Sequence, residues 1–348
     1  MAKKTGQYRF SFGPWNIHEG GDPFGPTVRQ PLEFSRKLEE YQKLGFEGVQ
    51  FHDDDAVPDL DKQPLATTLK QARQLGRILK DKGLIPEFVA PRLWEDPRTI
   101  DGGYTANDPA CRQYAIERSL KAVDIANELG CDLMVLWLAR EGTYIRESKN
   151  ARQAHEWLMT AINKMLAHDR KIRIAIEPKP NEPMDHAYIP TIGHAIAMAY
   201  ASADPRRVGG LIETAHAKLA GLDPSDEMAF ALYHKKLWSV HLNDQNGLKF
   251  DEDKNFGAVN LREAWNQVRV LEEAGYAQTG AFIGLDVKVM RTQKQDKNTM
   301  HLSNSKRFFE LMVQKVRTFD RKAEAQFIKE RDYEGLERMV IEHLLGVG

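Results

Sequence analysis

The sequence predicts an α/β fold, a closed (β/α)8 or TIM barrel with a C-terminal helical arm. Three observations support it. Short runs of β-type residues recur eight times before residue 287, segments of helical period separate them, and no glycine-rich dinucleotide fingerprint follows the first run, which disfavours an open doubly wound sheet. The predicted strands are Tyr8–Phe12, Gly48–His52, Leu84–Val89, Leu133–Trp137, Ile172–Glu177, Val208–Leu211, Leu237–Leu242 and Phe282–Asp286.

Helices are expected between these strands because the intervening apolar residues fall on one helical face. Ile116, Leu120 and Val123 share such a face in the segment after the third strand. Asn107–Pro109 carries the polar residues and proline of a helix start, and Gly130 falls where the helix should end. Strand and helix therefore alternate, as a barrel of parallel strands requires.

The chain changes character near residue 300. From there to residue 348 it is charged and helical in period, with no strand left to cover. One interpretation is a last barrel helix with a frayed end, and the other is a tail that wraps a neighbouring subunit. We predict the second, with a catalytic barrel over 1–299 and an arm for subunit contacts over 300–348.

The composition narrows the class of partner. Lysine and arginine number 49 against 50 aspartates and glutamates, for a net charge of -1, so nothing indicates binding to nucleic acid or to an anionic membrane. No run of 18 apolar residues is present, and no apolar stretch follows the basic first residues. A cytoplasmic protein that acts on a small molecule is expected.

Acidic and imidazole side chains stand at the ends of the later strands. In a parallel barrel the carboxyl ends of all strands meet at one mouth, where the chemistry takes place. Glu177, Glu213, His241 and Asp286 end the fifth to eighth strands, and His216, Asp251 and Asp253 follow nearby. Oxygen ligands with some imidazole suit Mg²⁺, Mn²⁺ or Co²⁺. Any one of these residues alone is more often a satisfied surface residue, but together they predict two adjacent cation sites.

Six motifs occur in an order that resembles xylose isomerase of the shorter, bacterial class I type. They are FHDDD at 51–55, DGGYTAND at 101–108, WLAREG at 137–142, IEPKPNEP at 176–183, LNDQNG at 242–247 and DVKVMRT at 286–292. Taken alone, the triplet Asp53–Asp55 could equally be a solvated run of charges.

The resemblance implies a role for each matching residue. His52, oriented by Asp55, helps to open the sugar ring, and Lys179 hydrogen-bonds the carbonyl end of the open chain. Two metal sites share one glutamate, with Glu177, Glu213, His241 and Asp286 in the first and Glu213, His216, Asp251 and Asp253 in the second. The substrate-binding residues are Trp15, Trp94, Trp137, Phe24, which resembles a residue that reaches into the neighbouring subunit, and Lys288, which is similar to a lysine just outside the metal ligands.

The resemblance further implies two divalent cations per subunit, or one if the second site is degenerate, and a homotetramer or dimer. The chain departs from the family at the seventh strand, where His241 stands in place of an aspartate. With this change the first site resembles the single-metal site of sugar epimerases and inosose dehydratases. Further departures at 138–139, 184–186 and 217–219 alter the same mouth.

Three hypotheses for the function follow. The first is a metal-dependent isomerase that interconverts an aldose and a ketose, such as xylose and xylulose, by ring opening and a hydride shift. The second, supported by His241, is a ketose 3-epimerase or a lyase of the same barrel superfamily. The third, and the least favoured, is a barrel that binds a sugar without catalysis.

Overall fold

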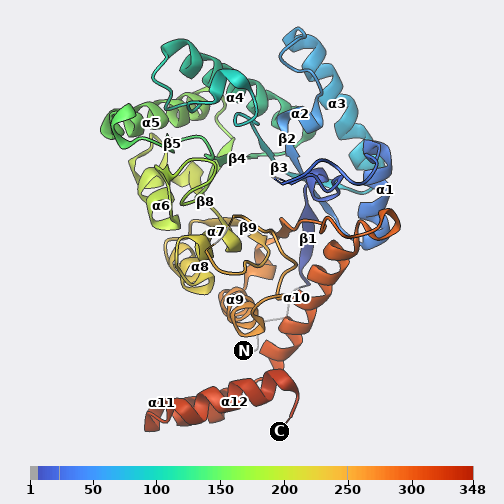
Figure 1. Cartoon of the computed structure of the whole chain (residues 1–348), viewed down its shortest axis with the longest axis vertical. Helices are drawn as coiled ribbons and strands as arrows, with labels where there is room; N and C mark the ends of the chain where they lie inside the picture. The colour runs from blue at the N-terminus through green and yellow to red at the C-terminus, as the bar shows by residue number, and fades with distance from the viewer. Residues whose placement is uncertain (1–6, 23, 249, 348) are drawn as a thin grey trace.

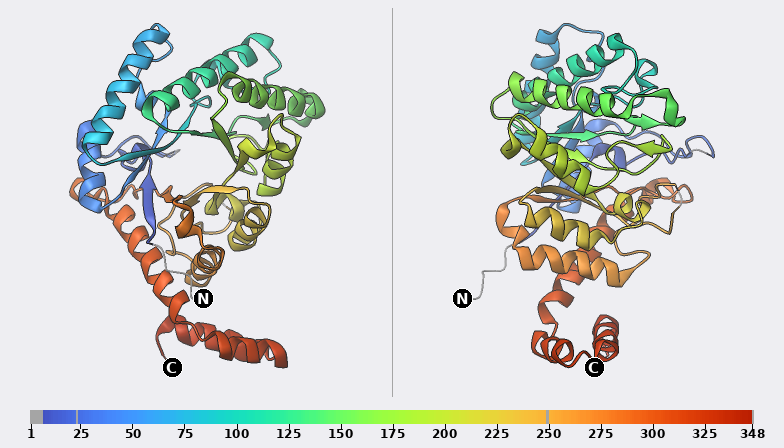
Figure 2. Two further views of the ribbon diagram at one scale, coloured as in Figure 1. Left: turned by 180° about the vertical axis from the view of Figure 1, so that it is seen from behind. Right: turned by 90° about the vertical axis from the view of Figure 1, so that its left-hand side faces the viewer.

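The barrel is closed and all of its neighbouring strands are parallel. The computed structural model describes residues 7–22, 24–248 and 250–347, and within them the strand order is β1-β10-β9-β8-β6-β4-β3-β2. Figures 1 and 2 show the strands at the centre and the helices around them. The strands are β1 (Arg9–Phe12), β2 (Gly48–His52), β3 (Ile85–Ala90), β4 (Leu133–Trp137), β6 (Arg173–Glu177), β8 (Val208–Glu213), β9 (Leu237–Leu242) and β10 (Phe282–Leu285). The predicted fold class is confirmed.

Two strand ends differ from the prediction in ways that affect the site. The sixth barrel strand, β8, continues past Leu211 to Glu213, and the eighth, β10, ends one residue before Asp286. All six residues of β8 are buried. A Cβ atom on Gly209 would come within 2.6 Å of the Trp238 ring, so a residue without a side chain lets the neighbouring strand pack closely.

Eight helices cover the outside of the strands. They are α1 (Phe34–Leu44), α3 (Leu65–Asp81), α4 (Pro109–Leu129), α5 (Ala151–His168), α6 (Ile192–Ala201), α8 (Pro224–Tyr233), α9 (Leu261–Ala274) and α10 (Met300–Thr318). The start of α4 follows the predicted signal, because the Asp108 side chain accepts a hydrogen bond from the Ala110 N–H. Gly130 ends this helix in the left-handed conformation.

Short elements at the carboxyl ends of the strands carry site residues. α2 (Asp53–Ala56) follows β2 directly, and α7 (Thr214–Leu219) follows β8 directly. β5 (Gly142–Thr143) and β7 (His186–Ala187) pair as a two-stranded antiparallel ribbon. The 3-10 helix η1 (Pro14–Asn16) follows β1. The chain therefore passes from β1, β2 and β8 into short elements at the barrel mouth with at most one residue between.

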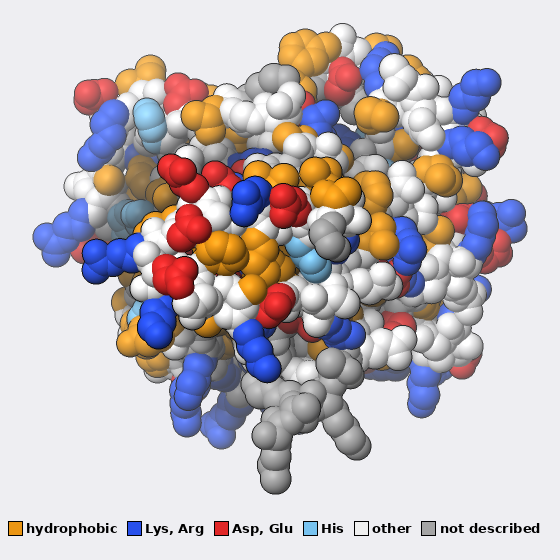
Figure 3. Space-filling model, turned by 90° about the horizontal axis from the view of Figure 1, so that it is seen from below, with side chains coloured by type: hydrophobic (Ala, Val, Ile, Leu, Met, Phe, Trp, Pro, Cys, Tyr) orange, Lys and Arg blue, Asp and Glu red, His pale blue; other side chains and the backbone are white. Residues whose placement is uncertain are grey.

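The C-terminal segment has two parts. α10 packs on the barrel, and its residues Leu302 and Phe309 are fully buried in the core. α11 (Arg321–Glu330) and α12 (Tyr333–Leu345) form a hairpin that projects beyond the barrel (Figure 1). The boundary expected at residue 300 therefore falls before a helix that covers the barrel, and the projecting part begins near Arg321. Viewed from this end, hydrophobic, acidic and basic side chains intermingle on the surface (Figure 3).

Within the described residues, no helix combines the length and the apolar character that crossing a bilayer would need.

Candidate functional site

A cavity of about 450 Å³ opens at the carboxyl ends of the strands. Most of the predicted site residues line it, although they come from segments far apart in the sequence. Its walls include Trp15, His52, Trp94, Trp137, Glu177, Lys179, Glu213, His216, His241, Asp251, Asp253, Asp286 and Lys288. The strand-end side chains therefore come together at one cavity, as their pattern in the sequence predicts.

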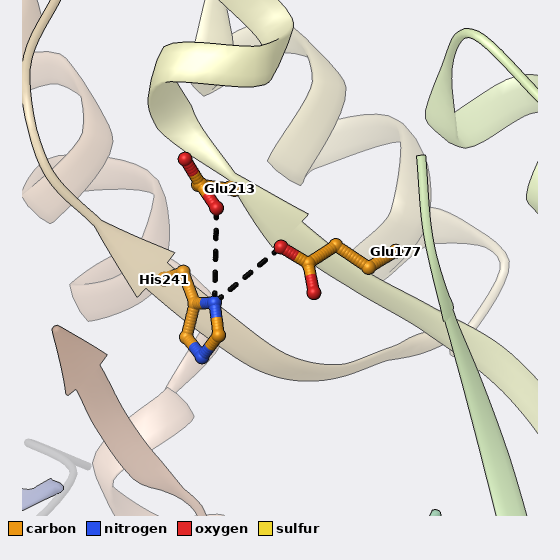
Figure 4. A group of neighbouring side chains, drawn as sticks. All are labelled: Glu177, Glu213 and His241. Atoms are coloured by element: carbon orange, nitrogen blue, oxygen red, sulfur yellow. Dashed lines mark ion pairs between the residues drawn. The ribbon is translucent and has the colours of Figure 1, made fainter. Parts of the chain in front are cut away.

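One group of ligand atoms is formed by neighbouring strands. Glu177 ends β6 and Glu213 ends β8, while His241 lies on β9 opposite Glu213 in the parallel register. His241 Nδ1 is 3.5 Å from a Glu177 oxygen and 3.9 Å from a Glu213 oxygen, and Figure 4 shows the three side chains pointing toward one another. All three are buried, and one atom from each lies within 4.8 Å of the others, which is close enough to hold a metal ion.

A second group shares Glu213 with the first. It adds His216 from α7 and Asp251 from the loop after β9, again with one atom of each residue within 4.8 Å of the others. His216 Nε2 lies 3.2 Å from a Glu213 oxygen and 3.0 Å from Asp251 Oδ2. Glu213 therefore lies between the two groups.

The electrostatics of these groups favour a bound cation. Burial raises the pKa of Glu213 well above its ordinary value, and the nearby charges of Asp251 and Asp253 add to that effect. Burial would also raise the pKa of Glu177, but the imidazoles of His241 and His216, with a hydrogen bond to Glu213, together outweigh it and hold the pKa at about 2. Clustered carboxylates repel one another, and a positive ion relieves that repulsion.

Several buried polar atoms of the site have no hydrogen-bond partner. Both ring nitrogens of His241, the Nδ1 atom of His216 and Asp251 Oδ1 are in this position. Unpaired buried polar atoms are costly in a native structure, and coordination of a metal ion would satisfy them. The donor set of carboxylates and imidazoles therefore fits a divalent cation.

Two of the predicted ligands lie outside both groups. Asp253 forms an ion pair with Lys288, whose Nζ atom is 2.8 Å from Asp253 Oδ2. Asp286 accepts hydrogen bonds from the Trp15 indole at 2.9 Å and from the Asn16 amide at 2.7 Å, and it lies 3.9 Å from His241 Nδ1. Both line the cavity, but the structure does not gather them with the other ligands.

Lys179 is buried and already paired. Its Nζ atom lies 2.9 Å from Asp251 Oδ2 and 3.3 Å from Glu182 Oε2, above the ring of Trp137. These carboxylates raise its pKa against the effect of burial, so the side chain stays charged. The cavity thus contains a fixed ammonium group beside the second ligand group.

The predicted pairing of His52 with Asp55 is present. His52 Nδ1 lies 2.8 Å from Asp55 Oδ2, and the three predicted tryptophans pack in a row beside this imidazole. The ring centroids of Trp15 and Trp94 are 4.2 Å and 5.1 Å from that of His52, and Trp137 packs edge-on against Trp94 at 4.5 Å. These rings form an apolar wall opposite the ligand groups.

The aspartate triplet is not a solvated run of charges. Asp53 is fully buried, and both of its oxygens accept hydrogen bonds from the guanidinium of Arg118 on α4 at 2.8 Å. Arg118 also contacts Asp54. The triplet is therefore anchored to the outer helices, which holds Asp55 in place.

Phe24 does not line the cavity of its own chain. Its side chain is 82% exposed, and the centroid of its ring lies 6.0 Å from that of Phe250. This position is compatible with the predicted reach into a second subunit.

Asn243, Glu182 and Arg92 are among the site residues that the sequence analysis did not single out. Asn243 donates a hydrogen bond to Glu213 at 2.8 Å, and Glu182 accepts one from the backbone N–H of Asp251. Both lie within quoted motifs, so the motifs could have indicated them. Arg92 contacts Asp54, Asp55, Glu95 and His52, but no acidic or histidine spacing marks it in the sequence.

Comparison with known proteins places the chain among proteins of the same barrel fold. Residues 38–298 match the family model described as xylose isomerase-like TIM barrel. The chain is 35% identical over 301 residues to a xylose isomerase of Thermus thermophilus, a match that covers 85% of this chain and 76% of the relative. It is 36% identical over 304 residues to a xylose isomerase of Thermus caldophilus, with the same coverage.

Solved structures share the fold at low sequence identity. A D-psicose 3-epimerase in the presence of D-fructose superposes with a TM-score of 0.63 at 13% identity, covering 88% of this chain and 99% of that one. An L-ribulose 3-epimerase superposes with a TM-score of 0.60 at 14% identity, covering 92% and 98%. At these identities the likeness establishes the barrel and nothing finer.

Proposed function

The chain belongs to the xylose isomerase-like TIM barrel family, and on that premise we propose that it is a metal-dependent isomerase that interconverts an aldose and a ketose. Xylose or a related sugar is the proposed substrate. The observation that carries the proposal is the single cavity in which two ligand groups share Glu213 and face Lys179 and His52. Substrate binding and cation binding would therefore take place side by side.

The residues that would hold the cations are those of the two groups. Glu177, Glu213 and His241 would hold the first, and Glu213, His216 and Asp251 the second, with Asp253 and Asp286 at their edges. A bound divalent cation supplies Lewis-acid polarisation of sugar oxygens. Mg²⁺, Mn²⁺ and Co²⁺ are the candidates, with one or two ions per subunit.

The remaining residues act on the sugar itself. His52, held by Asp55, lies where it can assist ring opening, and the ammonium group of Lys179 would stabilise negative charge that develops on the carbonyl oxygen. Trp15, Trp94 and Trp137 exclude water from the carbons between which hydrogen moves. Lys288, which pairs with Asp253, completes the proposed site.

Direct turnover tests this function. Purified protein loaded in turn with Mg²⁺, Mn²⁺ and Co²⁺ is expected to convert xylose, glucose or another aldose to the matching ketose. Folded, metal-loaded protein that converts no aldose would reject the proposal.

A second candidate function rests on His241. A histidine replaces the expected aspartate in the first ligand group, and its buried imidazole faces Glu177 and Glu213. This donor set favours a ketose 3-epimerase, in which a proton is removed and returned at one carbon. Turnover of a ketose in deuterated water distinguishes the candidates, because an epimerase incorporates deuterium at the reacting carbon and a hydride shift does not.

We also propose that the chain assembles as a homotetramer or dimer. The exposed Phe24 and the projecting hairpin of α11 and α12 are the surfaces available for such contacts. Light scattering of the full chain and of Phe24→Ala would test this assembly, and a monomeric full chain would reject it.

A further inference from the structure

Arg92 occupies a position beside His52 that no part of the proposed function uses. It follows β3, and its guanidinium donates from Nε to Asp54 at 2.8 Å and from Nη1 to Glu95 at 3.1 Å. Its Nη2 atom lies 2.9 Å from Asp55 Oδ1 and 2.7 Å from His52 Nδ1. The guanidinium therefore touches both members of the predicted ring-opening pair.

These contacts compete for one nitrogen. In a neutral imidazole, Nδ1 carries either a proton or a lone pair, whereas a guanidinium only donates. Nδ1 can thus donate to Asp55 or accept from Arg92, but it cannot do both. A proton on Nδ1 would oppose two N–H groups at 2.7 Å, which is repulsive beside a permanent cation.

Asp55 does not need the Nδ1 proton. Its Oδ1 atom accepts from Arg92 at 2.9 Å, and its Oδ2 atom accepts from the backbone N–H of His52 at 3.3 Å. Arg92 also neutralises this carboxylate, which weakens its demand for a second donor. The remaining Nη2 hydrogen of Arg92 has the lone pair of Nδ1 as its nearby acceptor.

We propose that Arg92 is a positioning residue that holds His52 in the tautomer with its proton on Nε2. His52 then presents an N–H group to the cavity, between the rings of Trp15 and Trp94. This is the reverse of the tautomer that Asp55 alone would select.

The tautomer determines which sugar atom His52 recognises, an extension that rests on the proposed function. An N–H group can bind an oxygen that carries no hydrogen of its own, such as the ring oxygen of a cyclic aldose or the carbonyl of an open chain, which a bare nitrogen cannot. A bare nitrogen would instead bind the hydrogen of a hydroxyl group. Arg92 thereby selects for an acceptor oxygen at this end of the sugar.

Nitrogen NMR of protein labelled with ¹⁵N-histidine tests the tautomer without any need for turnover. The spectrum of His52→Gln identifies the His52 signals among those of the eleven histidines. In the wild-type protein at neutral pH we expect a protonated Nε2 and an unprotonated Nδ1. A proton on Nδ1, alone or together with one on Nε2, would overturn the proposal.

Variants then identify the residue responsible. Arg92→Met is expected to move the proton to Nδ1, whereas Arg98→Met, which removes an arginine of the same loop that pairs with Asp96 and Asp61, should leave the His52 signals unchanged. An unchanged tautomer in folded Arg92→Met would refute the role of Arg92. If Arg92→Met does not fold, Arg92→Gln takes its place, because the wild-type spectrum reports the tautomer but not the residue that sets it.

Kinetics separate this inference from the proposed function. If aldoses are turned over, Arg92→Met should lower kcat/KM by about 100-fold, the lower end of the contribution of a positioned proton donor, and Arg98→Met should not. An unchanged kcat/KM in Arg92→Met would count against the inference. If no aldose is turned over, the proposed function is rejected. The proposed tautomer is then tested by the NMR spectrum, which does not depend on turnover.

Discussion

The two sides of the cavity mouth both contain clustered acidic residues, but these acids have different counter-charges. On one side, here called the paired side, Asp53, Asp54 and Asp55 are met by Arg92 and Arg118. On the other, here called the metal side, Glu177 and Glu213 face two histidines whose ring nitrogens are partly unpaired.

From this difference we infer that counter-charges, more than the acids themselves, distinguish a structural cluster from a candidate ligand site. A buried carboxylate satisfied by a bidentate arginine has no need of an ion. A buried carboxylate beside another carboxylate, with no guanidinium in contact, must take up a proton or bind a cation. Four predictions test this contrast, from the largest expected effect to the smallest.

Loss of Arg118 should destabilise the paired side most. Arg118 is only 7% exposed and its partner Asp53 is fully buried, so Arg118→Met leaves an uncompensated buried charge. Breaking such a pair costs about 3–5 kcal/mol, which equilibrium unfolding in urea would measure. Lys121→Met is the control on the same helix, because this half-exposed lysine lies 3.8 Å from Asp61 and should contribute less than about 1 kcal/mol. Equal losses in the two variants would contradict the contrast.

Loss of Glu213 should abolish cation binding on the metal side without a comparable loss of folding stability. Glu213 belongs to both ligand groups, so Glu213→Gln removes a ligand from each. We expect Mn²⁺ affinity to fall by more than about 100-fold, beyond the effect of residues that only orient ligands. Titration calorimetry measures the affinity, with Glu227→Gln, a half-buried glutamate of α8, as the control. Unchanged Mn²⁺ binding in Glu213→Gln would remove the basis for a shared site.

The stability of the segment that joins the two sides, Trp15 and Asn16, should decrease in acid. Asn16 hydrogen-bonds Asp286, its neighbour Trp15 packs on His52, and the Asn16 carbonyl contacts His301 at 2.8 Å. Burial, reinforced by the nearby charges of His18 and Arg29, lowers the pKa of His301 from 6.5 to about 4.

The unfolded chain therefore takes up a proton on this residue before the folded chain does. Its contribution to stability is complete above pH 6.5 and is lost as the pH falls toward 4, at up to about 1.4 kcal/mol per pH unit. His301→Gln should lose about 2 kcal/mol less than the wild-type protein between pH 7 and pH 4.5, measured by urea unfolding at each pH. Equal losses of unfolding free energy in both proteins would show that His301 does not cause the loss of stability at low pH.

The smallest effect concerns the choice of metal. Imidazole shifts preference from Mg²⁺ toward Mn²⁺ and later metals, so His241→Asp should lower the ratio of Mn²⁺ to Mg²⁺ affinity by about tenfold. His194→Asp, on the outer helix α6, is the control for an added charge. A ratio that does not change would mean that His241 is not a ligand.

Much of the fold and of the metal side was predictable from the sequence because both depend on local patterns. Strand-end residues such as Glu177 and His241 are marked by where the apolar runs stop, and parallel strands bring such ends together. The strand limit at Leu211 was set too early because Glu213 is polar, although it continues the buried strand.

The paired side was less accessible because its counter-charges come from distant segments. Arg118 belongs to none of the predicted motifs and lies 65 residues from Asp53 in the sequence. Arg92 follows β3, whereas the triplet follows β2. A solvated run of charges and a triplet paired with arginines look alike in sequence. Only the packing of α4 against α2 distinguishes them.

Anomalous X-ray scattering from crystals grown with excess manganese tests the central claim most directly. We predict a manganese peak between Glu177, Glu213 and His241, with none beside Arg92 and Arg118. A map without an ion at the first group, or with the metal bound among the aspartates of the paired side, would contradict the account.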